Sequence, residues 1–200
     1  MITLYIGKSG AGKDTFLKKQ VALGVNPIIS YTTRPMREGE VDGVDYHFVS
    51  LIKFLEMLDK KQLAEWRKYD TLINNQPETW YYGSPWLDKS KDYVGVVTPE
   101  GAKNYIKLYG AENIGVVYVV ADDDIREERA RMRESLSIEE WNITVKPEWD
   151  RRLEADSKDF SDEVIQDLAN ALGHKITVMF NNGYLDRVTF SWIYPLDKTT

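Results

Sequence analysis

The sequence predicts an α/β fold in which a parallel β-sheet is covered by helices on both faces, giving three layers. The first observation behind this prediction is that short apolar, β-branched runs alternate with segments of helical periodicity along the chain. The second is that Ile114–Val120 is apolar almost throughout, which is typical of a strand buried on both sides. The third is length, because 200 residues are enough for one domain with a substantial core.

The first half of the chain is expected to begin with a strand at residues 2–6, followed at once by a glycine-rich segment. Residues 15–23 have helical character, and Gly24 is a typical residue just beyond a helix end. Residues 28–50 combine β-branched residues with Gly and Pro, which indicates short strands and turns. Helical spacing returns over residues 51–66, in two pieces.

The second half alternates in the same way. A strand is expected at residues 93–97 and a helix at 99–108, with proline near its start. Three aspartates open a charged helix over residues 122–133, at the end where the helix dipole favours acids. Residues 134–147 lose clear periodicity, so we expect a mobile connection there. The remaining expected elements are a helix over residues 148–172 with a break near residue 160 and a strand over residues 176–180.

Composition narrows the classes of function. The chain has 26 Lys and Arg against 32 Asp and Glu, a net charge of −6, so it lacks the cationic surplus of a nonspecific nucleic-acid binder. It has no cysteine, which excludes disulfides, thiolate zinc sites and cysteine catalysis. The first residues lack the pattern of a signal peptide, and no apolar run approaches the ~20 residues that span a bilayer. We therefore expect a soluble, cytoplasmic protein with neither nucleic-acid nor membrane partners.

The glycine-rich segment after the first strand has the spacing of a phosphate-binding loop. Residues 7–13 read GKSGAGK and satisfy the pattern G-x-x-x-x-G-K, which predicts the P-loop NTPase form of the α/β fold. In such a loop glycines let backbone N–H groups surround a phosphate, and the lysine, here Lys13, reaches the β- and γ-phosphates of ATP. The expected ATP ligands in and beside this loop are Gly7, Ser9, Gly10, Ala11, Gly12, Lys13, Asp14 and Thr15.

The residue after the lysine departs from the usual pattern. A Ser or Thr normally follows this lysine and ligates Mg²⁺, but Asp14 occupies the position and Thr15 comes next. Asp14 either binds the metal as an anion, directly or through water, or repels the phosphates and weakens ATP binding. Thr15 supplies a substitute hydroxyl if the turn shifts slightly. Asp14 and Thr15 are therefore the candidate Mg²⁺ ligands.

A second anion site is indicated downstream. Arg34 and Arg37 lie three residues apart, and Tyr46 follows after a turn that contains glycine. Two guanidinium groups and a phenol hydroxyl suit the several acceptor oxygens of a phosphate monoester. The spacing alone fits equally well a surface hairpin whose arginines are solvated.

The surrounding residues resemble the guanylate kinase family. Residues 32–50 read TTRPMREGEVDGVDYHFVS and match the family signature TTRPxRxGExxGxDYxFVS at every position of that pattern. The phosphate loop lies upstream at the spacing of the family. Downstream, EW at residues 65–66 and YYGS at residues 81–84 resemble two further family motifs. The resemblance is strong over residues 1–84, weaker over residues 93–156 and thin beyond.

The resemblance implies a single guanylate kinase-like domain that carries a nucleoside monophosphate (NMP)-binding insertion and a lid. The implied core comprises residues 1–29, 85–128 and 148–200, with the NMP-binding region at 30–84 and the lid at approximately 129–147. The positions that match family GMP ligands are Ser30, Arg34, Arg37, Tyr46, Glu65, Tyr82, Ser84 and, with a changed residue type, Thr98. Glu65 matches the carboxylate that accepts from the N1–H and 2-amino groups of guanine, a paired donor edge that adenine lacks.

The family also implies cations around the transferred phosphoryl group. The matching catalytic positions are Lys13, Arg34, Arg129, Arg133 and Arg152. The alignment near the lid slips by a residue, so Arg131 and Arg151 are alternatives. Asn181 resembles an asparagine beside the adenine of ATP.

Two further departures from the family bear on its chemistry. Val96 and Thr98 stand where the family has two aspartates that orient the monophosphate and the Mg²⁺ shell. Asp14 is a candidate to supply the missing negative charge from the other side of the metal. The link formed by residues 67–80 is longer than usual in the family, which predicts a reshaped rim of the NMP pocket.

These features predict an ATP-dependent transferase that phosphorylates GMP or dGMP, in purine nucleotide metabolism, with ATP as co-substrate and Mg²⁺ as cofactor. The expected partners are small nucleotides, and the chain is expected to be a monomer or a homodimer. One alternative is a kinase for another nucleoside or deoxynucleoside monophosphate. The other is a non-catalytic guanylate kinase-like module that binds phosphopeptides or proteins.

Overall fold

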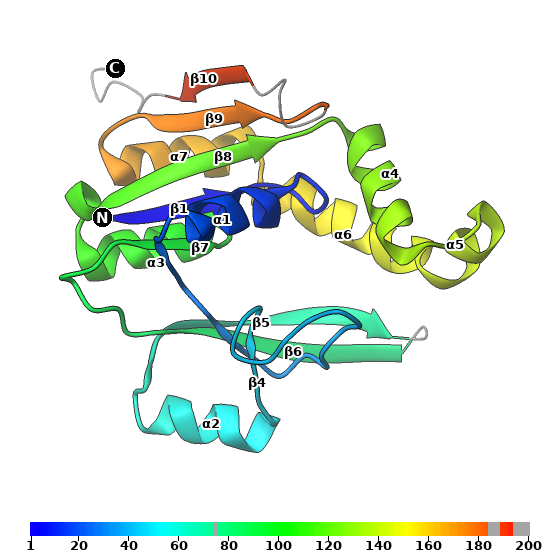
Figure 1. Ribbon diagram of the computed structural model, residues 1–200, viewed down its shortest axis with the longest axis horizontal. Helices are drawn as coiled ribbons and strands as arrows, with labels where there is room; N and C mark the ends of the chain where they lie inside the picture. The colour runs from blue at the N-terminus through cyan, green and yellow to red at the C-terminus, as the bar shows by residue number, and fades with distance from the viewer. Residues whose placement is uncertain (74–75, 184–188, 194–200) are drawn as a thin grey trace. The chain divides into compact units, whose positions relative to one another are not determined.

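The computed structural model describes residues 1–73, 76–183 and 189–193 (Figure 1). The chain divides into two compact units. The first unit consists of Met1–Asn26 and Asp92–Thr200, and the second of Pro27–Lys91. None of the described helices has the length and apolar character that crossing a membrane requires.

The first unit is built on a six-stranded sheet in the order β10-β9-β8-β1-β7-β2. β1 is the inner strand that leads into the phosphate loop, and it pairs in parallel with both β7 and β8. β8 pairs in parallel with β9, whereas β10 adds an antiparallel edge that the sequence analysis did not anticipate. The strand bounds are β1 Ile2–Ile6, β2 Asn26–Pro27, β7 Tyr93–Val96, β8 Ile114–Val120, β9 Ile176–Phe180 and β10 Thr189–Ile193.

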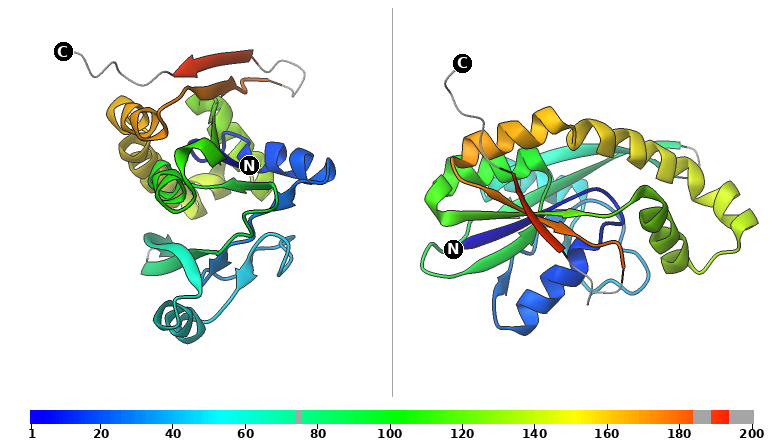
Figure 2. Two further views of the ribbon diagram at one scale, coloured as in Figure 1. Left: turned by 90° about the vertical axis from the view of Figure 1, so that its left-hand side faces the viewer. Right: turned by 90° about the horizontal axis from the view of Figure 1, so that it is seen from above.

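Helices cover both faces of this sheet, which confirms the predicted α/β fold. α1 lies on one face, and α3 and α7 lie on the other (Figure 2). Tyr5, Phe16, Val94, Val119 and Met179 form a buried cluster between the sheet and α1. The helix bounds are α1 Lys13–Ala22, α3 Pro99–Tyr109, α4 Asp123–Glu134, α5 Ile138–Thr144, α6 Lys146–Asp159 and α7 Asp162–Leu172, with a short 3-10 turn at Ala111–Asn113.

The expectation of a mobile connection over residues 134–147 is wrong. The segment contains α5, and α6 begins at its end. Ser137 starts α5 with a capping box, because its hydroxyl accepts from the N–H of Glu140 while the Glu140 carboxylate accepts from the N–H of Ser137. Trp141 then packs against Trp149 of α6, with ring centroids 6.2 Å apart. This tertiary packing overrides the weak local periodicity.

The second unit is a four-stranded sheet in the order β4-β3-β6-β5 with one helix packed on it. β5 and β6 form a long antiparallel hairpin, and β3 pairs with both β4 and β6. Phe54 and Met57 of the helix bury their side chains with Leu63 of β5. The bounds are β3 Tyr31–Thr32, β4 His47–Phe48, α2 Leu51–Asp59, β5 Leu63–Ile73 and β6 Gln76–Pro85.

The second piece of the helix predicted over residues 51–66 is wrong. α2 ends at Asp59, Lys61 adopts a left-handed backbone with φ of 52°, and Leu63 already begins β5. The predicted long link of residues 67–80 consists largely of the two arms of the hairpin, and its residues 74–75 lie outside the described residues. Cross-strand pairing with β6 decides the conformation here, and one-strand periodicity does not reveal such pairing.

Candidate functional site

The phosphate loop, residues 7–13, connects β1 to α1 in the first unit. Gly12 caps α1 in a left-handed conformation with φ of 94°, and a Cβ there would lie 2.6 Å from Asn181 Nδ2. Only glycine fits this position without displacing the asparagine. Lys13 Nζ donates hydrogen bonds to the carbonyl oxygens of Gly7 at 2.7 Å and Lys8 at 2.9 Å. The ammonium group therefore lies against the loop backbone.

Asp14 and Thr15 occupy the first turn of α1, directly after Lys13, and both are exposed. Their carboxylate and hydroxyl are hard oxygen donors of the kind that Mg²⁺ prefers. Among the described residues no group of three or more acidic or histidine side chains forms a metal cage. In phosphate-binding sites the protein often supplies only one or two ligands to Mg²⁺, and substrate phosphates and waters complete the coordination shell.

Asn181, a predicted ATP ligand, and Arg129, a predicted lid cation, both lie beside the phosphate loop. Asn181 is 4% exposed, and its Nδ2 donates to the carbonyl oxygen of Ala11 at 2.8 Å. Arg129 Nη2 donates to the carbonyl oxygens of Asn181 at 2.9 Å and Gly183 at 3.2 Å. Burial lowers the pKa of Arg129 from its usual value. These contacts join α4 and the segment after β9 to the loop.

The other predicted cations are on α4 and α6. Arg133 is exposed and lies 3.7 Å from Glu134 Oε1. Arg152 Nε donates to Glu148 Oε1 at 2.8 Å, and Arg151 donates to both oxygens of the same carboxylate, at 2.7 and 2.9 Å. Burial alone would raise the pKa of Glu148, but these hydrogen bonds outweigh it and lower the pKa to about 2.

Replacing Glu148 with glutamine is expected to destabilise the fold at neutral pH by about 1–3 kcal/mol, since the carboxylate loses its charge toward two arginines. The Glu148 pKa is depressed in the fold, so its contribution is present above pH 4.5 and is lost as pH falls through about 2. Thermal unfolding of both proteins between pH 7 and pH 3 measures the effect. A gap between the two unfolding midpoints that stays constant over this range contradicts the assignment.

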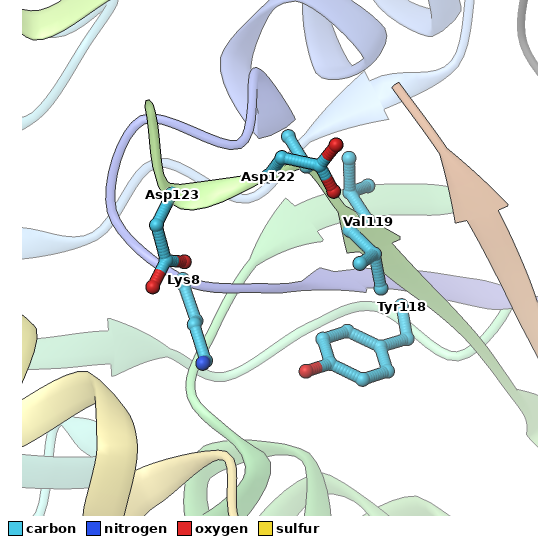
Figure 3. A pocket seen from close by; sticks show the side chains of 7 residues that line it. Lys8, Tyr118, Val119, Asp122 and Asp123 are labelled. Carbon is cyan, nitrogen blue, oxygen red and sulfur yellow. The ribbon is translucent and has the colours of Figure 1, made fainter. Parts of the chain in front are cut away.

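A pocket of about 320 Å³ lies at the carboxyl end of β8, next to the phosphate loop (Figure 3). This is the edge of an open parallel α/β sheet where ligands usually bind. The hydrogen bond from Arg126 lowers the pKa of Asp123, and the positive charge of Lys8 acts in the same direction. The lining residues are Lys8, Tyr118, Val119, Val120, Ala121, Asp122 and Asp123.

Two residues that sequence reasoning missed contact the loop directly. Arg126 of α4 is 1% exposed and donates to the carbonyl oxygen of Ser9 at 2.8 Å. Asp156 of α6 accepts from the N–H of Ser9 at 2.7 Å. No local pattern identifies this pair, because the two residues are 30 positions apart.

In the second unit, Arg34, Glu40, Tyr46 and Tyr82 form what we call the arginine cluster. Arg34 is 5% exposed, and its Nη2 donates to Glu40 Oε1 at 2.7 Å. Its guanidinium lies 5.5 Å from the centre of the Tyr46 ring, which in turn lies 6.0 Å from the Tyr82 ring. Three of the predicted phosphate ligands are therefore together. Glu40, which belongs to the signature but was not predicted as a site residue, orients the arginine.

Glu40 also organises the turn that carries Arg37. Its Oε2 accepts from the backbone N–H of Arg37 at 2.7 Å, and the Arg37 side chain is exposed. Burial would raise the pKa of Glu40, but the hydrogen bonds from Arg34 and Arg37 lower it below the usual range. The carboxylate therefore stays ionised and holds both arginine positions on one turn.

Ser30, Glu65 and Ser84 form a second group, which we call the carboxylate cluster. Ser84 Oγ donates to Glu65 Oε1 at 2.6 Å and lies 3.3 Å from Ser30 Oγ. Glu65 faces Ser84 across the β5–β6 pair, and Tyr82 lies two positions along β6 from Ser84. Because side chains alternate along a strand, Ser84 and Tyr82 share one face of the sheet. The carboxylate cluster and the arginine cluster therefore lie on the same face.

Thr98 lies in the first unit and starts α3. Its hydroxyl accepts from the N–H of Gly101 at 3.2 Å, so it serves as the N-cap of that helix. Val96 is the last residue of β7. These two positions thus offer one capping hydroxyl and one apolar side chain near the carboxyl end of β7.

Comparisons with known proteins find relatives of this chain. The family model described as guanylate kinase matches residues 2–76. A guanylate kinase of Syntrophus aciditrophicus is 31% identical over 178 residues, which cover 86% of this chain and 73% of the relative. One of Lactobacillus johnsonii is 29% identical over 184 residues, covering 87% and 85% of the two chains. One of Zymomonas mobilis is 34% identical over 133 residues, and the match spans only 58% of that relative.

A crystal structure of guanylate kinase from Anaplasma phagocytophilum aligns with a TM-score of 0.48 and 16% identity, covering 84% of this chain and 79% of the other. The matches with the Syntrophus and Lactobacillus relatives cover most of the length of both chains. The chain belongs to the guanylate kinase family.

Proposed function

We propose that this protein transfers the γ-phosphoryl group of ATP to a guanine nucleoside monophosphate, GMP or dGMP, and releases ADP and GDP or dGDP. The observation that carries the proposal is the arrangement of the second unit. A serine-bound carboxylate and a buried arginine with two tyrosines share one face of its sheet. The carboxylate suits a purine base with two neighbouring donor groups, and the arginine with the tyrosines suits a phosphate monoester. A guanine nucleoside monophosphate carries both of these groups.

On the acceptor side, Arg34, Arg37, Tyr46 and Tyr82 hold the monophosphate. The planar fork of a guanidinium and the phenol hydroxyls suit its several oxygens. Glu65 accepts from the N1–H and 2-amino groups of guanine. Ser84 supports this role by donating to Glu65 Oε1, so one carboxylate oxygen is already oriented. Ser30 extends the same group through its contact with Ser84.

On the donor side, the N–H groups of the phosphate loop and Lys13 hold the β- and γ-phosphates of ATP. Asn181 lies beside the adenine, supported by its contact with the carbonyl oxygen of Ala11. The lid cations are Arg129, Arg133 and Arg152. They belong to a lid of approximately residues 129–147 and to the helix that follows it. The acceptor phosphate is already an anion at neutral pH, so the reaction needs no general base, and catalysis rests on alignment and charge.

Mg²⁺ fits the oxygen donors at the start of α1. Asp14 and Thr15 would hold it, and the bound ion would neutralise charge on the phosphates. Thr98 caps α3 with its hydroxyl, so we propose that Asp14 supplies the anionic contact that Val96 and Thr98 do not.

An acceptor panel tests the proposed function. ADP release from ATP and Mg²⁺ is measured with GMP, dGMP, AMP, dTMP, CMP and UMP as acceptors. We expect kcat/KM for GMP or dGMP to exceed that for every other acceptor at least a hundredfold. A faster reaction with another monophosphate overturns the guanine assignment. If the folded protein phosphorylates none of these acceptors, the proposed kinase activity is contradicted, and the phosphopeptide-binding alternative is left.

Replacing Glu65 with glutamine is expected to lower kcat/KM for GMP about 10–100-fold, because hydrogen bonds to a charged partner contribute about 1.5–3 kcal/mol. The preference for GMP over IMP, which lacks the 2-amino group, is expected to shrink in the variant. Steady-state kinetics with both nucleotides measures the effect.

The matched control is Asp70→Asn, which changes an exposed carboxylate on the same strand that accepts from Thr79 Oγ1 at 2.8 Å. It is expected to leave both kcat/KM values unchanged. If Glu65→Gln behaves like this control, Glu65 does not contact the base.

A further inference from the structure

We propose that Arg126 and Asp156 are positioning residues for the ATP site. This oppositely charged pair binds the phosphate loop at Ser9 and links the loop to α6. The inference deepens the proposed function, since it concerns how the same loop is kept in shape for a triphosphate. Neither residue belongs to the loop motif or to the predicted lid cations.

The pair contacts both sides of one loop residue. Asp156 Oδ2 accepts from the N–H of Ser9 at 2.7 Å, and its Oδ1 accepts from the Ser9 hydroxyl at 3.4 Å. Arg126 Nη1 donates to the carbonyl oxygen of Ser9 at 2.8 Å and to Asp156 Oδ2 at 3.4 Å. An anion therefore binds the amide of Ser9 and a cation binds its carbonyl. Together they fix the orientation of both peptide groups that flank the residue.

The Arg126 and Asp156 side chains are largely shielded from water, so their charges have to be balanced inside the protein. The Arg126 side chain is 1% exposed and that of Asp156 is 13% exposed. The second guanidinium nitrogen, Nη2, donates to Asp123 Oδ1 at 2.6 Å, and the group lies 5.9 Å from the centre of the Trp149 ring. An unpaired buried charge is costly, and Asp156 is the more buried of the two carboxylates that neutralise Arg126. The Arg126 guanidinium is therefore held by hydrogen bonds to α4, to α6 and to the phosphate loop.

The loop also packs directly on α4 at this point. A Cβ at Gly10 would lie 2.7 Å from the carbonyl oxygen of Arg126, so the helix and the loop are in close contact. Asp156 lies four residues after Arg152 on α6, and residues four apart share one face of a helix. The helix that carries a predicted lid cation is thus attached to the phosphate loop one turn further along. The pair of Arg126 and Asp156 thereby fixes the position of the phosphate loop relative to α6.

Three variants and a control test the inference. Asp156→Asn removes the charge but keeps the shape, Arg126→Lys keeps the charge but loses the planar fork, and Arg126→Met/Asp156→Leu removes the buried pair. Glu154→Gln is the control, because Glu154 lies on the same helix and pairs with Lys158 at 2.7 Å at the surface. ATP affinity with Mg²⁺ is measured by calorimetry. The KM values for ATP and GMP and the unfolding midpoint are measured in parallel.

We expect Asp156→Asn and Arg126→Lys to weaken ATP binding tenfold or more and to raise the KM for ATP, while the KM for GMP stays within twofold. The double variant separates positioning from stability, because replacing a buried ion pair with apolar residues often preserves or raises stability. It is expected to recover the unfolding midpoint without recovering ATP affinity. The control is expected to match the wild type.

Wild-type affinity for ATP in the double variant overturns the inference, as does a lower midpoint with unchanged ATP affinity in Asp156→Asn. These failures leave the proposed function intact. Failure of the wild type itself to bind ATP overturns the proposed function, and the inference falls with it.

Discussion

Replacing Lys13 with methionine is expected to lower kcat for phosphoryl transfer about a thousandfold, since one preorganised charge contact to the reacting group contributes roughly 3–4 kcal/mol. Methionine keeps an unbranched stem of similar length but cannot donate to a phosphate. In the structure the ammonium is already placed over the loop by the carbonyl oxygens of Gly7 and Lys8. The variant therefore removes a preorganised cation from the site.

The measurement is kcat at saturating ATP and GMP, with unfolding midpoints recorded for both proteins. Lys18→Met is the matched control, because Lys18 is exposed on the same helix. It is expected to retain full activity. Turnover by Lys13→Met within tenfold of the wild type contradicts the assignment of the phosphate loop.

Replacing Arg34 with methionine is expected to weaken GMP binding a hundredfold or more, because charge-assisted hydrogen bonds to a phosphate contribute about 1.5–3 kcal/mol each. The same change is expected to destabilise the second unit by about 2–3 kcal/mol, since it leaves Glu40 partly buried without its cation. The Arg34 and Glu40 side chains are 4% and 19% exposed, so this ion pair is shielded from water.

Calorimetric titration with GMP and chemical unfolding separate the two effects. Arg34→Met/Glu40→Gln removes both charges and is expected to regain part of the stability but none of the GMP affinity. Lys53→Met, which removes an exposed lysine 3.8 Å from Glu56 on α2, is the control for loss of a cation. GMP affinity within threefold of the wild type in Arg34→Met contradicts the role of the arginine cluster.

The parts of the molecule that could be predicted from sequence are those whose geometry is local. The phosphate loop requires glycines and a lysine within seven residues, so its spacing alone identifies it, and the strand and helix on either side were correctly expected. The buried strand Ile114–Val120 was also correctly expected, because burial on both faces leaves a continuous apolar run.

The parts that sequence reasoning missed depend on contacts between distant residues. The periodicity of residues 51–66 predicts a helix at Glu65, but pairing of β5 with β6 puts it on a strand opposite Ser84. α5 forms because Trp141 packs on Trp149, which periodicity over fourteen residues does not reveal. Arg126 has the sequence context of an ordinary charged helix residue, and only the fold brings it to Ser9.

Two predicted departures from the family, Thr98 and the segment after Glu65, have defined places in the structure. The predicted change at Thr98 turns out to involve a helix cap, so its hydroxyl has a structural role whatever else it contacts. Residues 67–73 and 76–80 continue the β5–β6 hairpin beyond Glu65 and Ser84 and so extend the sheet that carries both clusters of the second unit. Whether that extension reshapes the rim of the NMP pocket stays a prediction.

Transfer of radiolabel from γ-³²P-ATP to unlabelled GMP tests the central claim most directly. We expect the label to appear in GDP, at the β-phosphate, in the wild-type protein and to be absent with Lys13→Met. This result requires both the phosphate loop and the acceptor site to act on one reaction. Label that appears only as inorganic phosphate, or that stays in ATP with folded protein and either GMP or dGMP present, contradicts the claim.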